Sequence, residues 1–207
     1  MITEFPLLAG LTSPGGITAG PDGNLWFSAG GGLGRITPAG VITPFVFALG
    51  ASPSIGTGPD GNVWFADIFS EPPTVGRLTT GGTLTEFTDT SSTGESGSIT
   101  TGPDGNLWFT EPFSGSIGVA RITPAGVITR FPFPTQFRSA PTWITTGPDG
   151  NLWFTELGNS IGVIVLTTAP SVPVLSGAAL TILGTLLVMI TLQALRRHRL
   201  DDSQIVT

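Results

Sequence analysis

The sequence predicts an all-β fold, a β-propeller of four recognisable four-stranded blades followed by one C-terminal transmembrane helix. Three features support this: an octapeptide that recurs four times, a second hairpin pattern after the copies, and a long uncharged stretch near the C-terminus. The octapeptide is Gly-Pro-Asp-Gly-Asn-Leu-Trp-Phe, with valine for leucine in the second copy. Its copies begin at Gly20, Gly58, Gly102 and Gly147. A period of roughly 40 residues is typical of repeat folds.

Each octapeptide reads as a turn followed by a strand. Proline fixes φ at the second turn position, and Asp22 and Gly23 are residues that turns favour. In the strand that follows, Leu25 and Phe27 point to one face and Trp26 to the other. A strand that is apolar on both faces is expected where a sheet is covered on both sides. We therefore expect each sheet to pack between two neighbouring sheets.

A second hairpin completes each unit. In the first copy, residues 33–36 lead through a Thr-Pro-Ala-Gly turn into residues 41–43, and residues 120–131 repeat this pattern closely. Two hairpins in roughly 40 to 45 residues have the dimensions of a propeller blade. The propeller is predicted over residues 2–168, with repeats at about 2–41, 42–83, 84–127 and 128–168.

The two ends of the repeat region suggest how the ring closes. The fourth copy stops near residue 168 and lacks an outer strand, whereas residues 2–6 resemble the outer-strand segment 128–132. We expect Ile2 to Phe5 to supply that missing strand, because closure removes exposed sheet edges. The alternatives are an open arc that forms a homodimer, or a fragment of a larger propeller.

The composition changes after residue 168. A linker at 169–176 precedes residues 177–195, which carry no charge and would span about 28 Å as a helix, enough to cross a bilayer core. Arginines follow at once in the basic and then polar tail, residues 196–207. The positive-inside rule places this tail in the cytoplasm and the propeller on the periplasmic or extracellular side. A buried core helix is the alternative interpretation.

The first ten residues have no basic region, long apolar run or cleavage site of a signal peptide. Because an exported propeller needs such a signal, we expect further sequence upstream of Met1, with more blades as an option. Export that relies on the C-terminal span is the alternative.

The charge pattern argues against nucleic acid as a partner. The chain has no lysine, no basic cluster in the repeats and a net charge of −6, whereas nucleic-acid affinity comes largely from neutralising phosphates. The absence of cysteine excludes disulfides and thiolate metal sites.

The repeat with its Arg-Ile-Thr-Pro-x-Gly hairpin resembles the blade of the streptogramin B lyase (virginiamycin B lyase) family over residues 2–168. That resemblance implies a seven-bladed ring and a metal-assisted elimination that opens a cyclic depsipeptide, using histidines and glutamates. Residues 172–176, the apolar span and the arginines resemble IPTL-type C-terminal sorting signals of Gram-negative bacteria. This second resemblance implies a sorting peptidase as a partner.

The family's histidine position does not hold histidine in this chain. It falls on Gly15, Gly97 and Thr142, with a shorter segment around Ser54 in the second copy, and the single histidine, His198, lies in the tail. The family's strand-end glutamate does match this chain in part. Its counterparts are Glu111 and Glu156, with Asp67 as a near equivalent and Ala29 as a loss.

Proton abstraction near neutral pH usually relies on histidine, and the repeats offer none. Glu111 and Glu156 are the candidate catalytic residues. Together with Asp67 they could bind Mg²⁺ or Ca²⁺ and polarise a carbonyl. The alternative is that these acids are solvated strand ends and that the protein needs no cofactor.

Trp143 falls outside the octapeptides. With Glu95, Arg138 and Thr142 it is a candidate for a ligand pocket at the propeller mouth, and a plug of a narrow channel is the alternative.

The sequence leaves two functions open. The first is an exported, membrane-anchored module that binds a ligand or serves a structural role; the second is a lyase-like enzyme whose catalytic blades lie upstream or in a partner. The missing histidines favour the first.

Overall fold

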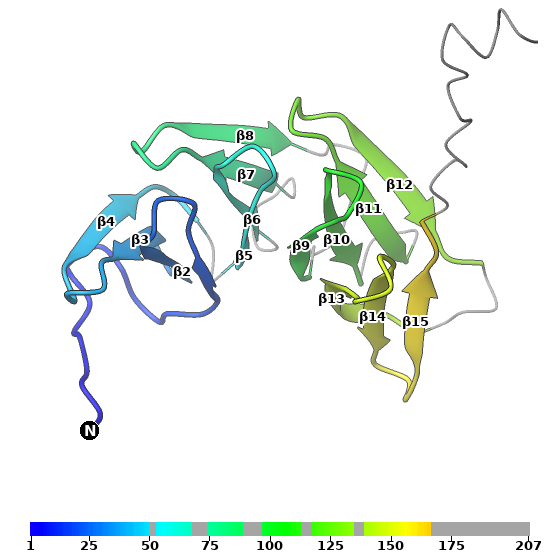
Figure 1. Ribbon diagram of the computed structural model, residues 1–207, viewed down its shortest axis with the longest axis horizontal. Helices are drawn as coiled ribbons and strands as arrows, with labels where there is room; N and C mark the ends of the chain where they lie inside the picture. The colour runs from blue at the N-terminus through cyan, green and yellow to red at the C-terminus, as the bar shows by residue number, and fades with distance from the viewer. Residues whose placement is uncertain (50–52, 68–73, 89–96, 113–116, 135–138, 167–207) are drawn as a thin grey trace, which may run out of the picture. The chain divides into compact units, whose positions relative to one another are not determined.

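The computed structural model consists of small antiparallel sheets that follow one another along the chain (Figure 1). In the described part of the chain, three sheets have four strands in sequence order and the fourth has three, so the predicted blade architecture is confirmed. Residues 1–166 form one compact unit. The structure describes residues 1–49, 53–67, 74–88, 97–112, 117–134 and 139–166.

The four blades repeat the same order of strands. The first strands are β1 (Ile17–Ala19), β5 (Ser54–Thr57), β9 (Ile99–Thr101) and β13 (Pro141–Thr146). The octapeptides enter β2 (Leu25–Ala29), β6 (Val63–Asp67), β10 (Leu107–Glu111) and β14 (Leu152–Glu156). The third strands are β3 (Gly32–Ile36), β7 (Thr74–Leu78), β11 (Gly118–Ile122) and β15 (Ile161–Ile164). The outer strands are β4 (Ile42–Val46), β8 (Leu84–Thr88) and β12 (Ile128–Pro132).

Each blade packs on the next through its first strand and through the tryptophan of its octapeptide. β1 lies against β5, β5 against β9 and β9 against β13. Trp26, Trp64 and Trp108 are almost completely buried, each in a cluster with apolar residues of the following blade. Burial of one aromatic ring removes 150–250 Å² of surface from water, so these tryptophans dominate the contacts between blades.

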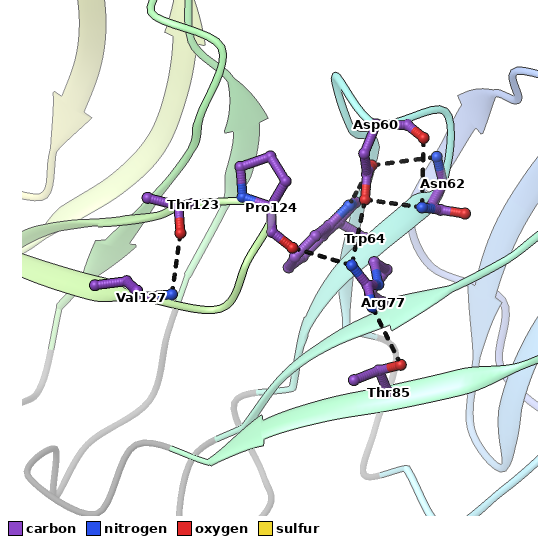
Figure 2. A network of polar contacts seen from close by, with 8 residues as sticks. All are labelled: Asp60, Asn62, Trp64, Arg77, Thr85, Thr123, Pro124 and Val127. Atoms are coloured by element: carbon purple, nitrogen blue, oxygen red, sulfur yellow. Dashed lines mark hydrogen bonds and ion pairs between the residues drawn. The ribbon is translucent and has the colours of Figure 1, made fainter.

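A polar network links the octapeptide of one blade to the next blade (Figure 2). Trp64 Nε1 donates a hydrogen bond to Asp60 Oδ1 at 2.9 Å, and Arg77 Nη1 lies 3.6 Å from Asp60 Oδ2. Arg77 Nη1 also donates to the carbonyl of Pro124 in the following blade at 3.0 Å. Its guanidinium lies 5.6 Å from the centroid of the Trp64 ring and 5.6 Å from the centroid of the Phe87 ring. The arginine therefore binds two blades together.

The predicted closure by Ile2 to Phe5 is wrong. This segment forms no strand, and among the described residues the sheet of blade 4 consists of β13, β14 and β15. The described strands of blade 4 pack mainly on blade 3, and no extensive contact joins them to blade 1. The Phe5 ring lies instead against Gly40, so closely that a Cβ there would overlap it.

The predicted linker, transmembrane helix and tail at residues 169–207 lie outside the described residues. Within the described ranges, no helix is long and apolar enough to cross a membrane.

Candidate functional site

Glu111, the last residue of β10, is almost completely buried and forms an ion pair. Arg130 Nε, on β12, donates to Glu111 Oε1 at 3.0 Å. Burial raises the pKa of Glu111 to about 7, while the neighbouring guanidinium favours its carboxylate form. A carboxyl group with a pKa near neutrality is suited to proton transfer, but here one of its oxygens is already bound by a cation of the same blade.

The other strand-end acids lie in different surroundings. Glu156 ends β14, is partly exposed, and accepts a hydrogen bond from the hydroxyl of Ser160. Asp67 ends β6 and is buried opposite Thr74. Ala29 takes the equivalent place in blade 1 and is fully buried. Equivalent positions in the four blades therefore do not form a uniform ring of acids.

A metal ion of the kind that the resemblance implies needs several ligands that converge. Among the described residues, no group of three acids or histidines lies close enough to hold one. Glu111 is engaged with Arg130, and Glu156 with Ser160. As they are placed, these acids do not converge on a common site for such an ion. Binding of a cation by Asp67, Glu111 and Glu156 together stays a prediction.

The positions that match the family's histidines lie beside the first strands. The Gly15 and Gly97 amides donate to the carbonyls of Ser28 and Thr110 at 2.9 and 2.7 Å. At Gly97 a side chain has no room, because a Cβ would overlap the Thr110 hydroxyl. A histidine at this position would require the Thr110 side chain to move.

The predicted ligand pocket is only partly described, because Glu95 and Arg138 lie outside the described residues. The hydroxyls of Thr142 and Thr155 are 2.7 Å apart, so Thr142 is held within its own blade. Trp143 is 70% exposed, and its backbone amide donates to the Thr155 hydroxyl at 3.3 Å. The indole of Trp143 is therefore available for contact with a partner.

A groove of about 480 Å³ lies at the edge of blade 4. Its walls come from the outer strand of blade 3 and from β14 and β15, and they are mostly apolar. Phe131, Phe133, Phe154 and Ile161 line it, and Glu156 adds a carboxylate. The groove is an apolar site next to a strand edge, which differs from a polar catalytic cleft.

These blades, with their octapeptides and strand-end acids, match one known family. The sequence pattern of the Virginiamycin B lyase family matches residues 1–178. The chain belongs to this family. The predicted resemblance is thus confirmed for the repeats, while the predicted sorting signal is not addressed by this match.

Solved structures of Virginiamycin B lyase family members are similar to this chain. Selenomethionine-substituted virginiamycin B lyase from Staphylococcus aureus is 38% identical, with a TM-score of 0.72, and the match covers 80% of this chain and 57% of that one. A catalytically inactive histidine-to-alanine variant from the same organism, with quinupristin, is 37% identical, with a TM-score of 0.68 and coverage of 75% and 53%. A streptogramin B lyase is 32% identical, with a TM-score of 0.64 and coverage of 80% and 59%. Curated protein sequences gave no match.

This chain therefore spans between half and three fifths of the length of these relatives. The blade architecture extends over the matched part, and the activity printed for the relatives belongs to their longer chains.

Sequence reasoning missed the role of the arginines that bind blades together. Arg35 donates to the carbonyl of Thr80 at 3.2 Å, as Arg77 does to Pro124. The signal was present, since an arginine stands opposite the tryptophan in blades 1 to 3. Its partner is a backbone carbonyl of another blade, which no residue pattern identifies.

Proposed function

We propose that this chain is a non-catalytic member of the Virginiamycin B lyase family, a propeller module that serves in binding or assembly at a membrane surface. The observation that carries the proposal is the chemistry at the family's histidine positions, which hold Gly15, Gly97 and Thr142. Fold alone does not confer activity, and without a base near neutral pH the elimination implied by the family lacks its proton acceptor.

The geometry of the acids supports the same proposal. Glu111 is a buried carboxyl group whose pKa is raised to about 7, so it could replace the histidine, but its Oε1 accepts the hydrogen bond of Arg130. Proton abstraction by Glu111 would neutralise its carboxylate and so remove the attraction within this buried ion pair, which is costly.

Incubation of the full chain with quinupristin and Mg²⁺ tests the proposal, with virginiamycin B lyase as positive control. We expect no ring opening by mass spectrometry beyond that of a buffer blank. Ring opening that is lost in Glu111→Gln or Glu156→Gln would overturn the proposal in favour of a lyase-like enzyme. A Glu86→Gln variant is the matched control, because Glu86 is an exposed acid of the neighbouring blade.

The membrane location is part of this proposal and rests on the sequence. Residues 177–195 carry no charge, and Arg196, Arg197 and Arg199 follow them. We propose that this segment spans the membrane with the arginines in the cytoplasm. Leu186→Arg, at the centre of the span, should release the chain from washed membranes, because a central arginine costs about 2.5–3.5 kcal/mol. Leu200→Arg, outside the span, should leave it bound; equal behaviour of the two variants would contradict the span.

A further inference from the structure

Consecutive blades share a contact of three residues. Trp26 stacks on Phe45 of its own outer strand with ring centroids 5.0 Å apart, and the Phe45 ring lies against Gly82, in a turn of the next blade. In the second blade the same contact joins Trp64, Phe87 and Gly126, with ring centroids 5.4 Å apart. The outer-strand phenylalanine therefore fills the space between its own tryptophan and the next blade.

The two ends of the described chain each hold half of this contact. Trp153 of blade 4 is 39% exposed, and no aromatic ring of the described residues stacks on it. Phe5 is 46% exposed and lies against Gly40 of blade 1, as Phe45 lies against Gly82. Relative to blade 1, Phe5 thus takes the place of an outer-strand residue from a preceding blade.

The face of blade 1 that would meet a preceding blade is uncovered. Its first-strand residue Ile17 is 63% exposed, whereas the equivalent Ile55, Ile99 and Ile144 are buried in clusters with the tryptophan of the preceding blade. Leu25 is exposed in the same way, although its counterparts in the other three blades are completely buried.

We propose that two copies of this chain associate head to tail, with blade 1 of one copy covering the Trp153 face of blade 4 of the other. Residues 2–5 of the first copy then become the outer strand of that blade 4. Phe5 stacks on Trp153 while it stays on Gly40, which completes the three-residue contact between chains.

The edge of β15, which pairs with no further strand among the described residues, fits this added strand. In blade 3 the outer strand pairs Ile128 with Ile122 and Phe131 with Val119. By the equivalent register, Ile2 lies opposite Ile164 and Phe5 opposite Ile161. Addition of a strand to an open edge satisfies backbone groups that would otherwise face solvent, and is a common mode of protein recognition.

The apolar groove gives the added strand a place for Ile2. The counterparts of Ile2 in blades 2 and 3 are Leu84 and Ile128, which pack against the clusters around Trp26 and Trp64. Ile2 is 93% exposed in the single chain. In the assembly its side chain lies over the groove beside Phe133.

We infer that a second copy of this chain covers the Trp153 face, because blade 1 and residues 2–5 of one copy together supply the two things that blade 4 lacks: a neighbouring apolar face and an outer strand. The N-terminal segment is already seated on blade 1, so the uncovered apolar face and the missing outer strand are presented together. A head-to-tail interface forms a closed ring when its rotation closes. The described residues of two copies together hold eight blades, which is within the usual range of about 4–8 blades.

Trp143 contributes to the same interface. Its counterpart Ser54 reaches the next blade, where its hydroxyl accepts a hydrogen bond from the Ile99 amide at 3.1 Å. By equivalence with Ser54, Trp143 would lie toward the first strand of the partner's blade 1. Exposed tryptophans are frequent centres of binding energy in interfaces.

Three residues make this interface different from those within the chain. Ala19 stands where Thr57 and Thr101 donate hydrogen bonds to the preceding blade. Val163 replaces the arginine of the other blades, and Glu4 replaces Arg130, the partner of Glu111. Glu4 would lie near Glu156, so the association rests on apolar contacts and gains nothing from ion pairs.

Cysteine cross-linking of the full chain in mild detergent tests the proposal, since the native chain has no cysteine. Ile2→Cys and Ile164→Cys variants are mixed and oxidised. We expect a disulfide-linked dimer, because the two positions face each other across a strand pair. Ile2→Cys mixed with Val127→Cys, an exposed position of blade 3, is the control. No cross-link in the mixture, an equal yield in the control, or an internal disulfide in the double variant Ile2→Cys, Ile164→Cys would overturn the proposal.

The mass and strength of the complex give a second test that does not depend on the disulfide. Light scattering should give twice the chain mass, 2 × 21.3 = 42.6 kDa after subtraction of detergent. Ile17→Asp should give a monomer, while Val127→Asp should not change the mass. Glu4→Arg should lower the dissociation constant roughly tenfold by pairing with Glu156 as Arg130 pairs with Glu111. A monomer at all concentrations, or a dimer indifferent to both Ile17→Asp and Glu4→Arg, would contradict the association.

Discussion

Trp64 and Trp153 belong to almost identical octapeptides and have different surroundings. Each indole donates a hydrogen bond to the aspartate four residues earlier, Asp60 at 2.9 Å and Asp149 at 3.0 Å. Trp64 is fully buried, whereas Trp153 is 39% exposed. The octapeptide therefore encodes the turn and the direction of the ring, and the next blade provides the burial.

The largest expected effect tests this difference directly. Trp64→Ala should lower the free energy of unfolding by about 3–5 kcal/mol, as is usual for a buried tryptophan. Trp153→Ala should lower it by about 1–2 kcal/mol, because a large part of its surface remains in water. Denaturant titrations followed by circular dichroism measure both, at concentrations where a chain does not associate. Equal losses would show that the next blade is not the source of the stabilisation.

Arg77 and Val163 occupy equivalent places opposite these tryptophans. Arg77→Met should cost about 1–3 kcal/mol, since it removes a charged hydrogen bond to the Pro124 carbonyl and the contact with the Trp64 ring. Arg77→Lys is the conservative control and should recover part of this loss, because lysine keeps the charge without the planar group. If Met and Lys variants unfold alike, the charge contributes nothing between blades.

The sequence was sufficient for the blades because their determinants are local. Turn residues, the two-faced strand and the second hairpin all lie within one period, and each appears in the structure at its predicted place. The contact made by the N-terminal segment was not predictable in the same way. The segment resembles an outer strand in sequence but forms no strand, and Phe5 contacts the turn glycine Gly40 of blade 1. The sequence pattern cannot say which blade is its neighbour.

The candidate site was harder to predict because its properties arise between strands. Glu111 and Glu156 have the same sequence context, yet the first is buried against Arg130 and the second accepts a hydrogen bond from Ser160. The difference comes from the residue two strands away, which is arginine only in blade 3. The sequence alone was enough to place each glutamate at the end of its strand, but the partner of each carboxylate depends on how the strands pack.

The pH dependence of stability should report the burial of Glu111. Burial raises the pKa of Glu111 from 4.5 to about 7, so the folded protein binds this proton more tightly than the unfolded chain. The stabilisation is complete below about pH 4.5 and is lost as the pH rises toward 7. The ion pair with Arg130 reduces the size of the effect.

Glu111→Gln should flatten the pH dependence of the free energy of unfolding between pH 4.5 and 7. The octapeptide aspartates do not interfere in this window. For Asp60, burial raises the pKa, but the hydrogen bonds of Asn62 and Trp64 outweigh it and lower the pKa below 3.8. Its stabilisation is lost only as the pH falls below that value. A slope that persists in Glu111→Gln would assign the proton to another group.

The smallest expected effect comes from restoring the arginine to blade 4. In Val163→Arg the guanidinium can lie over Trp153 and near Asp149, as Arg77 lies over Trp64 and near Asp60. We expect a gain of about 0.5–1 kcal/mol in the single chain, because this position is 43% exposed and no later blade among the described residues offers a carbonyl. Asp149→Asn in the same background should remove the ionic part of this gain. If the dimer forms as proposed, Val163→Arg should also lower its dissociation constant, because the arginine can donate to the carbonyl of Pro38 in the partner's blade 1, as Arg77 donates to that of Pro124. A variant that is stabilised as a monomer but has an unchanged dissociation constant would argue against that alignment.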